Sequence, residues 1–236
     1  MKNYLSALKY CYENGDFVKS RAGNVKKAFG YQMRFDLEKG FPAITTKKLS
    51  WKAVVSELLW FLEGSNDERR LAEILYEDDR ENLEDKKTIW TQNAKADYWK
   101  NKSNFDGDVG KIYGVQWRDF NGVDQIKNLI KGLKESPHSR RHILTAWNPA
   151  ELDEMSLPPC HAFSQFYVSN NKLSCQLYQR SCDMFLGVPF NIASYSILIH
   201  IIAKECGYEV GEFIHSLGDF HIYEEHFEQV KIQLTR

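Results

Sequence analysis

The sequence predicts an α+β fold in which helices pack against a β-sheet. Apolar residues recur at i, i+3, i+4 and i+7 across residues 123–136, which predicts an amphipathic helix that ends before Pro137. From Arg141 onward the hydrophobic period changes to two, as it does in strands. Residues 191–207 are apolar on nearly all sides, which predicts a helix buried against the sheet.

Two of the predicted helices carry signals at their ends. Ser50 suits the N-cap of a helix over residues 51–63, and Gly64 suits its end. Glu57 lies inside the apolar pattern of this helix, where a carboxylate is costly unless it has partners. Gly207 closes the buried helix in the same way.

Three segments alternate polar and apolar residues as strands do, namely residues 142–148, 162–168 and 172–179. Asn170 and Asn171 separate the last two, and they suit a tight hairpin because asparagine tolerates positive φ. In the last strand Leu173, Cys175 and Leu177 should face one side of the sheet. The polar residues between them should face the other.

Charge and cysteine content exclude several classes of protein. Lysine plus arginine (31) nearly cancels aspartate plus glutamate (32), so a net charge of -1 offers no broad field for DNA or an anionic membrane. No segment resembles a signal peptide or a membrane span, and a cytoplasmic protein is expected. The five cysteines contain no CxxC pair, so free thiols are expected, with no disulfide framework and no metal site.

We expect one domain over residues 1–236. Residues 65–108 differ in kind, because they carry dense charge and few periodic apolar positions. They are predicted to form a surface insertion or a small lobe.

Several polar residues have both a structural and a chemical interpretation. Cys160 follows two prolines at the start of a strand, and is either a small buried residue or a nucleophile activated by nearby positive charge. Glu57 is either a core carboxylate with partners or a proton-handling group. Asn191 is either the N-cap of the buried helix or a reader of the donor–acceptor edge of uracil. His221 and Tyr223 alternate on a strand-like segment, residues 219–223, and either belong to the core or bind a sugar.

Four arginines suit a phosphate, because a guanidinium donates two parallel hydrogen bonds. Taken singly, Arg21, Arg140, Arg141 and Arg180 each fit a solvated surface position better than a binding role. Ser181 beside Arg180 adds a neutral donor. Arg140 and Arg141 are adjacent, so on a strand they would point to opposite faces. A loop or a subunit boundary would remove that objection.

The order of these segments resembles thymidylate synthase. The matching segments are GYQMRFDLEKGFPAITTKK, ELLWFLEG, IYGVQWRDF, SRRHILTAWNPAELDEMSLPPCHAFSQFYV, KLSCQLYQRSCDMFLGVPFNIASY and GDFHIYEEH. They cover nearly the whole chain apart from residues 65–108, and the stretch from Ser139 to Tyr195 is highly specific. The resemblance implies a thymidylate synthase-like α+β fold, with a mixed β-sheet, flanking helices and one buried helix.

The resemblance also implies a chemistry, in which one carbon passes from 5,10-methylenetetrahydrofolate to C5 of dUMP. Cys160 would add to C6 of the pyrimidine, and asparagine at position 191 favours uracil over cytosine. The implied catalytic residues are Cys160, Glu57, Tyr113, His161, Asn191 and Asp183. The implied dUMP-binding residues are Arg21, Arg140, Arg141, Gln179, Arg180, Ser181, Asn191, His221 and Tyr223. The implied folate-binding residues are Lys47, Trp90, Asp183, Gly187 and Phe190. The protein would be a homodimer in which Arg140 and Arg141 reach the partner's site.

The carboxyl-terminal end departs from the family pattern. The chain stops at Arg236, soon after HIYEEH, whereas thymidylate synthases ordinarily continue with a segment that closes over the folate. In an open site, water can add to the methylene at C5 in place of hydride. The short end therefore favours a dUMP 5-hydroxymethylase, with an ordinary thymidylate synthase as the alternative. A second alternative is a nucleotide- or RNA-binding homologue without turnover, which the intact Cys160, Glu57 and Asn191 disfavour.

Overall fold

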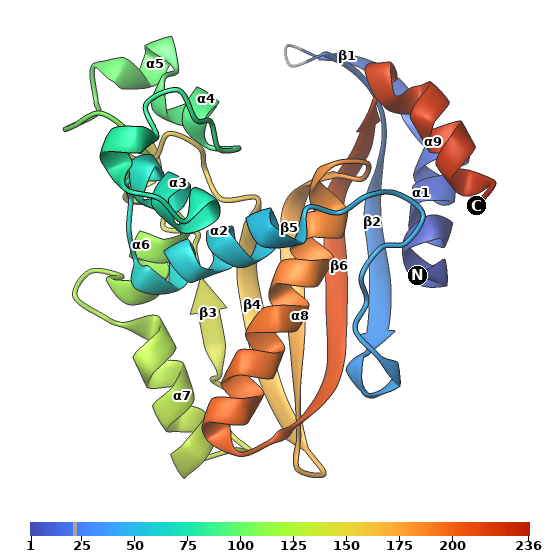
Figure 1. Cartoon of the computed structure of the whole chain (residues 1–236). Coiled ribbons are helices and arrows are strands. Elements are labelled where there is room, and N and C mark those ends of the chain that lie inside the picture. The colour runs from blue at the N-terminus through green and yellow to red at the C-terminus, as the bar shows by residue number, and fades with distance from the viewer. Residues whose placement is uncertain (21–22) are drawn as a thin grey trace. The chain divides into compact units, whose positions relative to one another are not determined.

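The computed structural model describes residues 1–20 and 23–236 and confirms the α+β class (Figure 1). The chain divides into two compact units. The first contains residues 1–50, 133–142 and 160–236, and the second contains residues 51–132 and 143–159. The α-helices are α1 (Lys2–Asn14), α2 (Trp51–Glu63), α3 (Glu68–Tyr76), α4 (Thr91–Ala94), α5 (Asp97–Lys100), α6 (Tyr113–Arg118), α7 (Gln125–Glu135), α8 (Gly187–Cys206) and α9 (Phe227–Leu234). The strands are β1 (Asp16–Ser20), β2 (Gly23–Asp36), β3 (Ile143–Thr145), β4 (His161–Ser169), β5 (Lys172–Asp183) and β6 (Glu209–Tyr223).

The sheet strands of the first unit follow the order β1-β2-β6-β5-β4. The β1/β2, β2/β6 and β4/β5 pairs are antiparallel, whereas β5 and β6 are parallel, so the sheet is mixed. Asn170 and Asn171 connect β4 to β5 with φ values of 50° and 59°, which confirms the predicted hairpin. Leu173, Cys175 and Leu177 are buried while the residues between them are more exposed, which confirms the predicted alternation.

Helix α8 forms the connection between the parallel strands β5 and β6 and lies against both of them (Figure 1). It ends at Gly207 with φ 78°, as predicted. It begins at Gly187, however, so Asn191 lies inside the helix and its interpretation as an N-cap is wrong. The chain turns earlier because Oδ1 of Asp183 accepts hydrogen bonds from the backbone N–H groups of Phe185 (3.0 Å) and Leu186 (3.1 Å).

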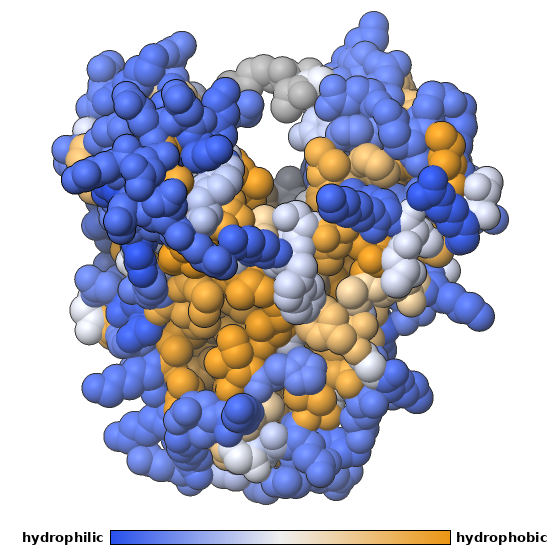
Figure 2. Space-filling view, viewed as in Figure 1, coloured by the Kyte–Doolittle hydropathy of each residue, from blue (hydrophilic) through white to orange (hydrophobic). Residues whose placement is uncertain are grey.

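Helix α2 is the central element of the second unit and packs against α3 and α6. It runs from Trp51 to Glu63 and ends at Gly64 with φ 77°, as predicted. Residues 65–108 contain α3, α4 and α5, and their surface in Figure 2 is mostly hydrophilic. Two charged residues of this segment, Glu68 and Arg69, are nevertheless buried, which differs from the solvated surface expected of the insertion.

Across residues 1–20 and 23–236, no helix is long and apolar enough to cross a membrane. The cysteines are free thiols.

Candidate active site

In the first unit, Cys160 lies at the start of β4, where its sulfur faces an arginine of β5. The backbone N–H of Arg180 donates to the carbonyl oxygen of Cys160 (2.8 Å), which fixes the two strand ends together. Nη2 of Arg180 lies 4.0 Å from Sγ of Cys160, and the cysteine is partly exposed. Positive charge favours the thiolate, which is the nucleophilic form of cysteine. The arrangement therefore suits a nucleophile that a small molecule can reach.

The parallel pairing of β5 and β6 brings the predicted sugar-binding residues to the same end of the sheet. Asp183 is paired with His221, and the backbone N–H of Met184 donates to the carbonyl oxygen of His221 (2.8 Å). Nδ1 of His221 lies 3.2 Å from Oδ1 of Asp219, and its ring centroid lies 5.3 Å from that of Tyr223.

Tyr223 shares its electrostatic surroundings with Cys160, the predicted nucleophile. Burial is the main cause that raises the pKa of Tyr223, and negative charge at Asp183 and Cys160 raises it further. Cys160, Asp183 and Tyr223 therefore share one electrostatic environment at this end of the sheet.

The turn before α8 gathers most of the predicted folate-binding residues. Nζ of Lys47 donates to the carbonyl oxygen of Phe185 and lies 4.1 Å above the centre of its ring, and burial lowers the pKa of this lysine. Gly187 opens the helix, and a Cβ atom there would meet Cβ of Asp183 at 3.6 Å and Oδ1 of Asn191 at 3.9 Å. The backbone of Gly187 thus lies close to the side chains of both Asp183 and Asn191.

Gln179, a predicted dUMP-binding residue, and His161, a predicted catalytic residue, are both buried and hydrogen-bonded. Gln179 is 2% exposed, and its Nε2 donates to the carbonyl oxygen of Ser181 (3.0 Å) while its Oε1 lies 2.8 Å from Nε2 of His215. Nδ1 of His161 lies 3.1 Å from the hydroxyl of Tyr195. Burial lowers the pKa of both histidines to about 3, so they are neutral at physiological pH.

His215 and Tyr195 were missed by sequence reasoning. His215 lies on β6 between the buried residues Phe213 and Leu217 in a period-2 pattern. The sequence signal that could have revealed His215 is a histidine at an inward-facing position of a strand.

In the second unit, Glu57, Trp90 and Tyr113 meet although they are far apart in the sequence. Glu57 is 8% exposed, and its Oε1 accepts a hydrogen bond from Nε1 of Trp90 (2.7 Å). Burial raises the pKa of Glu57 to about 7, and the bond from Trp90 partly opposes that shift. The rings of Trp90 and Tyr113 lie 5.9 Å apart in a T-shaped contact. A buried carboxyl that titrates near neutral pH can accept and return a proton.

Arg140 and Arg141 lie beside the middle of β4 and not beside its start at Cys160. Both are exposed and precede β3 in irregular structure, so the opposite faces expected on a strand do not apply. Nε2 of Gln165, in the middle of β4, donates to the carbonyl oxygen of Arg140 (3.2 Å). Arg21 and its predicted phosphate contact lie outside the described residues.

Comparison with known proteins identifies the family. The model of the thymidylate synthase family matches residues 2–236. This chain belongs to the thymidylate synthase family. It is 48% identical over 246 residues to a thymidylate synthase of Mycoplasma genitalium, and 45% identical over 257 residues to one of Mycoplasma pneumoniae. Each comparison covers 100% of this chain and 86% of the relative.

Enzymes of the thymidylate synthase family transfer one carbon from 5,10-methylenetetrahydrofolate to C5 of a pyrimidine nucleotide, and this chain is an enzyme of that kind. The folate is a co-substrate. Within the described part of the chain, no three histidine, cysteine, aspartate or glutamate side chains gather in a way that could hold a metal ion.

Proposed function

We propose that the protein is a thymidylate synthase that converts dUMP and 5,10-methylenetetrahydrofolate to dTMP and dihydrofolate. The observation that carries the proposal is the partly exposed Cys160 sulfur, 4.0 Å from the Arg180 guanidinium, in a member of this family. The names of the two Mycoplasma relatives support methylation over hydroxymethylation.

Cys160 acts as the nucleophile in this proposal. Its thiolate forms a bond to C6 of the uracil ring, and the electrons of the C5–C6 double bond move toward C5 and O4. C5 then bonds to the carbon carried by the folate. Loss of the C5 proton breaks the bond between that carbon and the folate nitrogen, so tetrahydrofolate leaves and a methylene remains at C5. Hydride from the tetrahydrofolate reduces the methylene to a methyl group as the cysteine is expelled, which restores the C5–C6 double bond and leaves dihydrofolate. Arg180, the nearby cation, stabilises the attacking thiolate.

The residues around Cys160 bind the rest of the nucleotide. We propose that Asn191 reads the uracil edge through its amide, and that His221 and Tyr223 bind the deoxyribose. Gln179 and Asp183 form the floor. Arg180 and Ser181 bind the phosphate together with Arg21, the residue outside the described range. These roles are supported by the convergence of the strand ends at Cys160, Asp183 and His221.

Glu57 handles protons in the proposed reaction. Its pKa of about 7 leaves both protonation states populated near neutral pH, which suits a group that takes up and returns a proton. Tyr113 and Trp90 hold it in an apolar aromatic environment. His161 is neutral, because burial lowers its pKa to about 3, so it serves as a hydrogen-bonding group.

The turn before α8 fits the folate. Gly187 has no side chain, and a Cβ atom there would contact Cβ of Asp183 and Oδ1 of Asn191. Phe190 lies one turn into the helix and is partly exposed. We propose that these residues, with Lys47 and Trp90, hold the folate, which supplies both the carbon and the hydride.

A homodimer is proposed because one face of the first unit's sheet carries exposed aromatic side chains. Phe163 of β4 is paired with Tyr178 of β5, and these residues are 40% and 43% exposed. Tyr167, two positions beyond Gln165 on the same face of β4, is 64% exposed. Such a patch favours contact with another protein surface. In the dimer, Arg140 and Arg141 reach the phosphate in the partner's site.

Because dUMP and folate are charged metabolites of the cytoplasm, we propose a cytoplasmic location.

Mass spectrometry of the nucleotide formed from dUMP and 5,10-methylenetetrahydrofolate tests the proposed reaction. We expect the methyl product, together with the absorbance of dihydrofolate. A 5-hydroxymethyl product without dihydrofolate would contradict the proposal and support the hydroxymethylase instead.

A further inference from the structure

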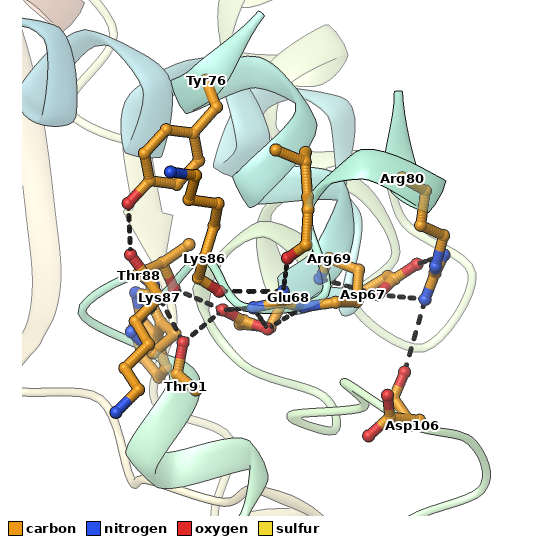
Figure 3. Close-up of polar contacts among 12 residues, drawn as sticks. Asp67, Glu68, Arg69, Tyr76, Arg80, Lys86, Lys87, Thr88, Thr91 and Asp106 are labelled. Carbon is orange, nitrogen blue, oxygen red and sulfur yellow. Dashed lines mark hydrogen bonds and ion pairs between the residues drawn. The ribbon is translucent and has the colours of Figure 1, made fainter. Parts of the chain in front are cut away.

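Helix α3 contains two adjacent charged residues that are removed from water. Glu68 is 1% exposed and Arg69 is 8% exposed. Nε and Nη2 of Arg69 donate to the carboxylate of Glu68 at 2.6 and 2.5 Å (Figure 3). A buried ion pair adds little net stability, because desolvation offsets the attraction between the charges. The pair is better explained by the geometry that it imposes on its neighbours.

The carboxylate of Glu68 orients two hydroxyl groups. Oε1 of Glu68 accepts from the hydroxyls of Thr88 (2.7 Å) and Thr91 (2.6 Å), as Figure 3 shows. Each hydroxyl has one proton, and donating it to Glu68 leaves the oxygen free to accept elsewhere. Thr88 Oγ1 accepts from the backbone N–H of Trp90 (3.1 Å), and Thr91 Oγ1 accepts from the backbone N–H of Thr88 (2.8 Å). The turn at residues 88–91 is thus tied to Glu68.

Helix α3 also holds the residues just before this turn. Nη1 of Arg69 donates to the carbonyl oxygens of Leu83 and Lys86, each at 3.0 Å. The hydroxyl of Tyr76, at the end of α3, donates to the carbonyl oxygen of Lys87 (2.8 Å). Residues 86, 87 and 88 are therefore each fixed to the same helix (Figure 3).

The fixed segment ends on the indole that contacts Glu57. Nε1 of Trp90 donates to Oε1 of Glu57 (2.7 Å), and the indole is 5% exposed. Its ring lies 5.8 Å from Trp60 and 5.9 Å from Tyr113. Burial raises the pKa of Glu57 and the hydrogen bond from Trp90 lowers it. The state of Glu57 therefore depends on where Trp90 is held.

We propose that the Glu68–Arg69 pair, acting through the hydroxyls of Thr88 and Thr91, is a positioning device that holds the Trp90 indole against Glu57. The inference rests on the proposed function, because Glu57 matters to turnover only if it handles protons in the reaction. It gives the charged segment 65–108 a role in the site, although Glu68 and Arg69 touch no reacting group.

The test compares Thr91→Val, which has the same shape without the hydroxyl, with Thr91→Ser, which keeps the hydroxyl. Infrared spectra of the ligand-free protein are recorded against pH, and the Glu57 carboxyl band is identified by its absence in Glu57→Gln. Because the indole N–H stabilises the charged carboxylate, its displacement raises the proton affinity of Glu57. We expect Thr91→Val to raise that affinity about tenfold, in the same direction as Trp90→Phe, and Thr91→Ser to titrate like the wild type.

The pH profile of turnover on dUMP should shift toward higher pH in Thr91→Val and remain unshifted in Thr91→Ser. Thr88→Val, which removes the hydroxyl that accepts from the backbone of Trp90, repeats the infrared test at a second position if Thr91→Val does not fold. The inference is overturned if Trp90→Phe moves the Glu57 titration while folded Thr91→Val or Thr88→Val does not. It is also overturned if Trp90→Phe leaves the titration unchanged. If the wild type does not convert dUMP, the proposed function fails, whereas the infrared titration still decides whether Thr91 positions Trp90.

Discussion

The cysteines of this protein differ in what surrounds their sulfur atoms. Burial raises the pKa of Cys11 to about 12, and it raises the pKa values of Cys175 and Cys182 still further above the usual range. Such thiols stay protonated at neutral pH and are poor nucleophiles. Cys160 is partly exposed and lies 4.0 Å from a guanidinium nitrogen of Arg180. The surroundings therefore distinguish the proposed nucleophile from the structural cysteines.

Replacing Cys160 by serine tests this assignment. The hydroxyl of serine is a much weaker nucleophile than a thiolate, so we expect kcat for dTMP formation to fall at least about 10³-fold. Binding of dUMP, measured by calorimetry, should persist because the arginines are untouched. Cys206→Ser, at a partly buried thiol near the end of α8, is the matched control and should keep its activity. Undiminished turnover in Cys160→Ser would remove the nucleophile from the proposal.

Glu57 links activity to a pH-dependent loss of stability. Its pKa is about 7 in the folded protein and 4.5 in its ordinary state, so the folded state holds this proton more tightly. Between these two values the native protein binds more protons than the unfolded chain, and the free energy of unfolding falls as pH rises. The loss is complete above pH 7 and amounts to at most about 3 kcal/mol.

Glu57→Gln removes this pH-dependent loss of stability, because glutamine does not titrate. We expect the variant to gain stability relative to the wild type when the pH rises from 5 to 8, as measured by urea denaturation at both values. Its kcat should fall about 10²- to 10⁴-fold, because the proton-handling group is lost. Glu81→Gln, at an exposed position of the same unit, is the control. An equal stability difference at pH 5 and pH 8 would show that Glu57 does not titrate in this range.

At the scale of elements, the sequence predicted the helix ends and turns that are fixed by residues within them. Gly64 ends α2 and the Asn170–Asn171 pair forms the hairpin because these residues adopt positive φ with little strain. The start of α8 was not predictable in this way. The carboxylate of Asp183 fixes the start of α8, because it accepts hydrogen bonds from backbone N–H groups in the turn before the helix. Asp183 belongs to the preceding strand, so the sequence around Asn191 carries no signal for this start.

Long strands were also harder to predict than helices. Strand β6 covers Glu209–Tyr223, whereas the sequence indicated only its last residues, and β2 (Gly23–Asp36) was not predicted. Charged and aromatic residues alternate irregularly in both strands. Their pairing with each other over residues 25–36, a tertiary property, fixes the strands in place.

The close approach of α6 to α2 gives a prediction at this scale. A Cβ atom at Gly114 would lie 2.6 Å from the carbonyl oxygen of Phe61 and 2.8 Å from its Cα. Gly114→Ala must therefore move α6, and with it Tyr113, away from α2. We expect a loss of about 1–3 kcal/mol in the free energy of unfolding and a reduced kcat. Val115→Ala, at a partly exposed position of the same helix, should have a smaller effect on both. Wild-type stability in Gly114→Ala would contradict the tight packing.

For the whole molecule, the resemblance to a family predicted the site residues, and the structure shows hydrogen bonds between some of them. The Glu57–Trp90 hydrogen bond joins residues 33 positions apart, and neither helical nor strand periodicity in the sequence predicts that they meet. Glu68 and Arg69 looked like part of a solvated charge run, yet they are buried. Burial of a charge depends on partners that come from elsewhere in the fold, so composition alone could not reveal it.

The proposed homodimer predicts that two inactive variants restore activity to each other. Arg140→Ala/Arg141→Ala lacks the arginines that reach the partner, and Cys160→Ser lacks the nucleophile. In a mixed dimer, one site receives an intact Cys160 from the first variant and intact arginines from the second. We therefore expect each variant alone to be nearly inactive. When the two variants are mixed, reversibly dissociated and reassociated, the sample should recover up to about a quarter of the wild-type activity per subunit. The reason is that half of the dimers are mixed, and each mixed dimer has one complete site. A mixture with Cys160→Ser/Arg140→Ala/Arg141→Ala in place of Cys160→Ser is the control and should stay inactive. No recovery in a mixture that sedimentation shows to be dimeric would confine the phosphate site to one subunit.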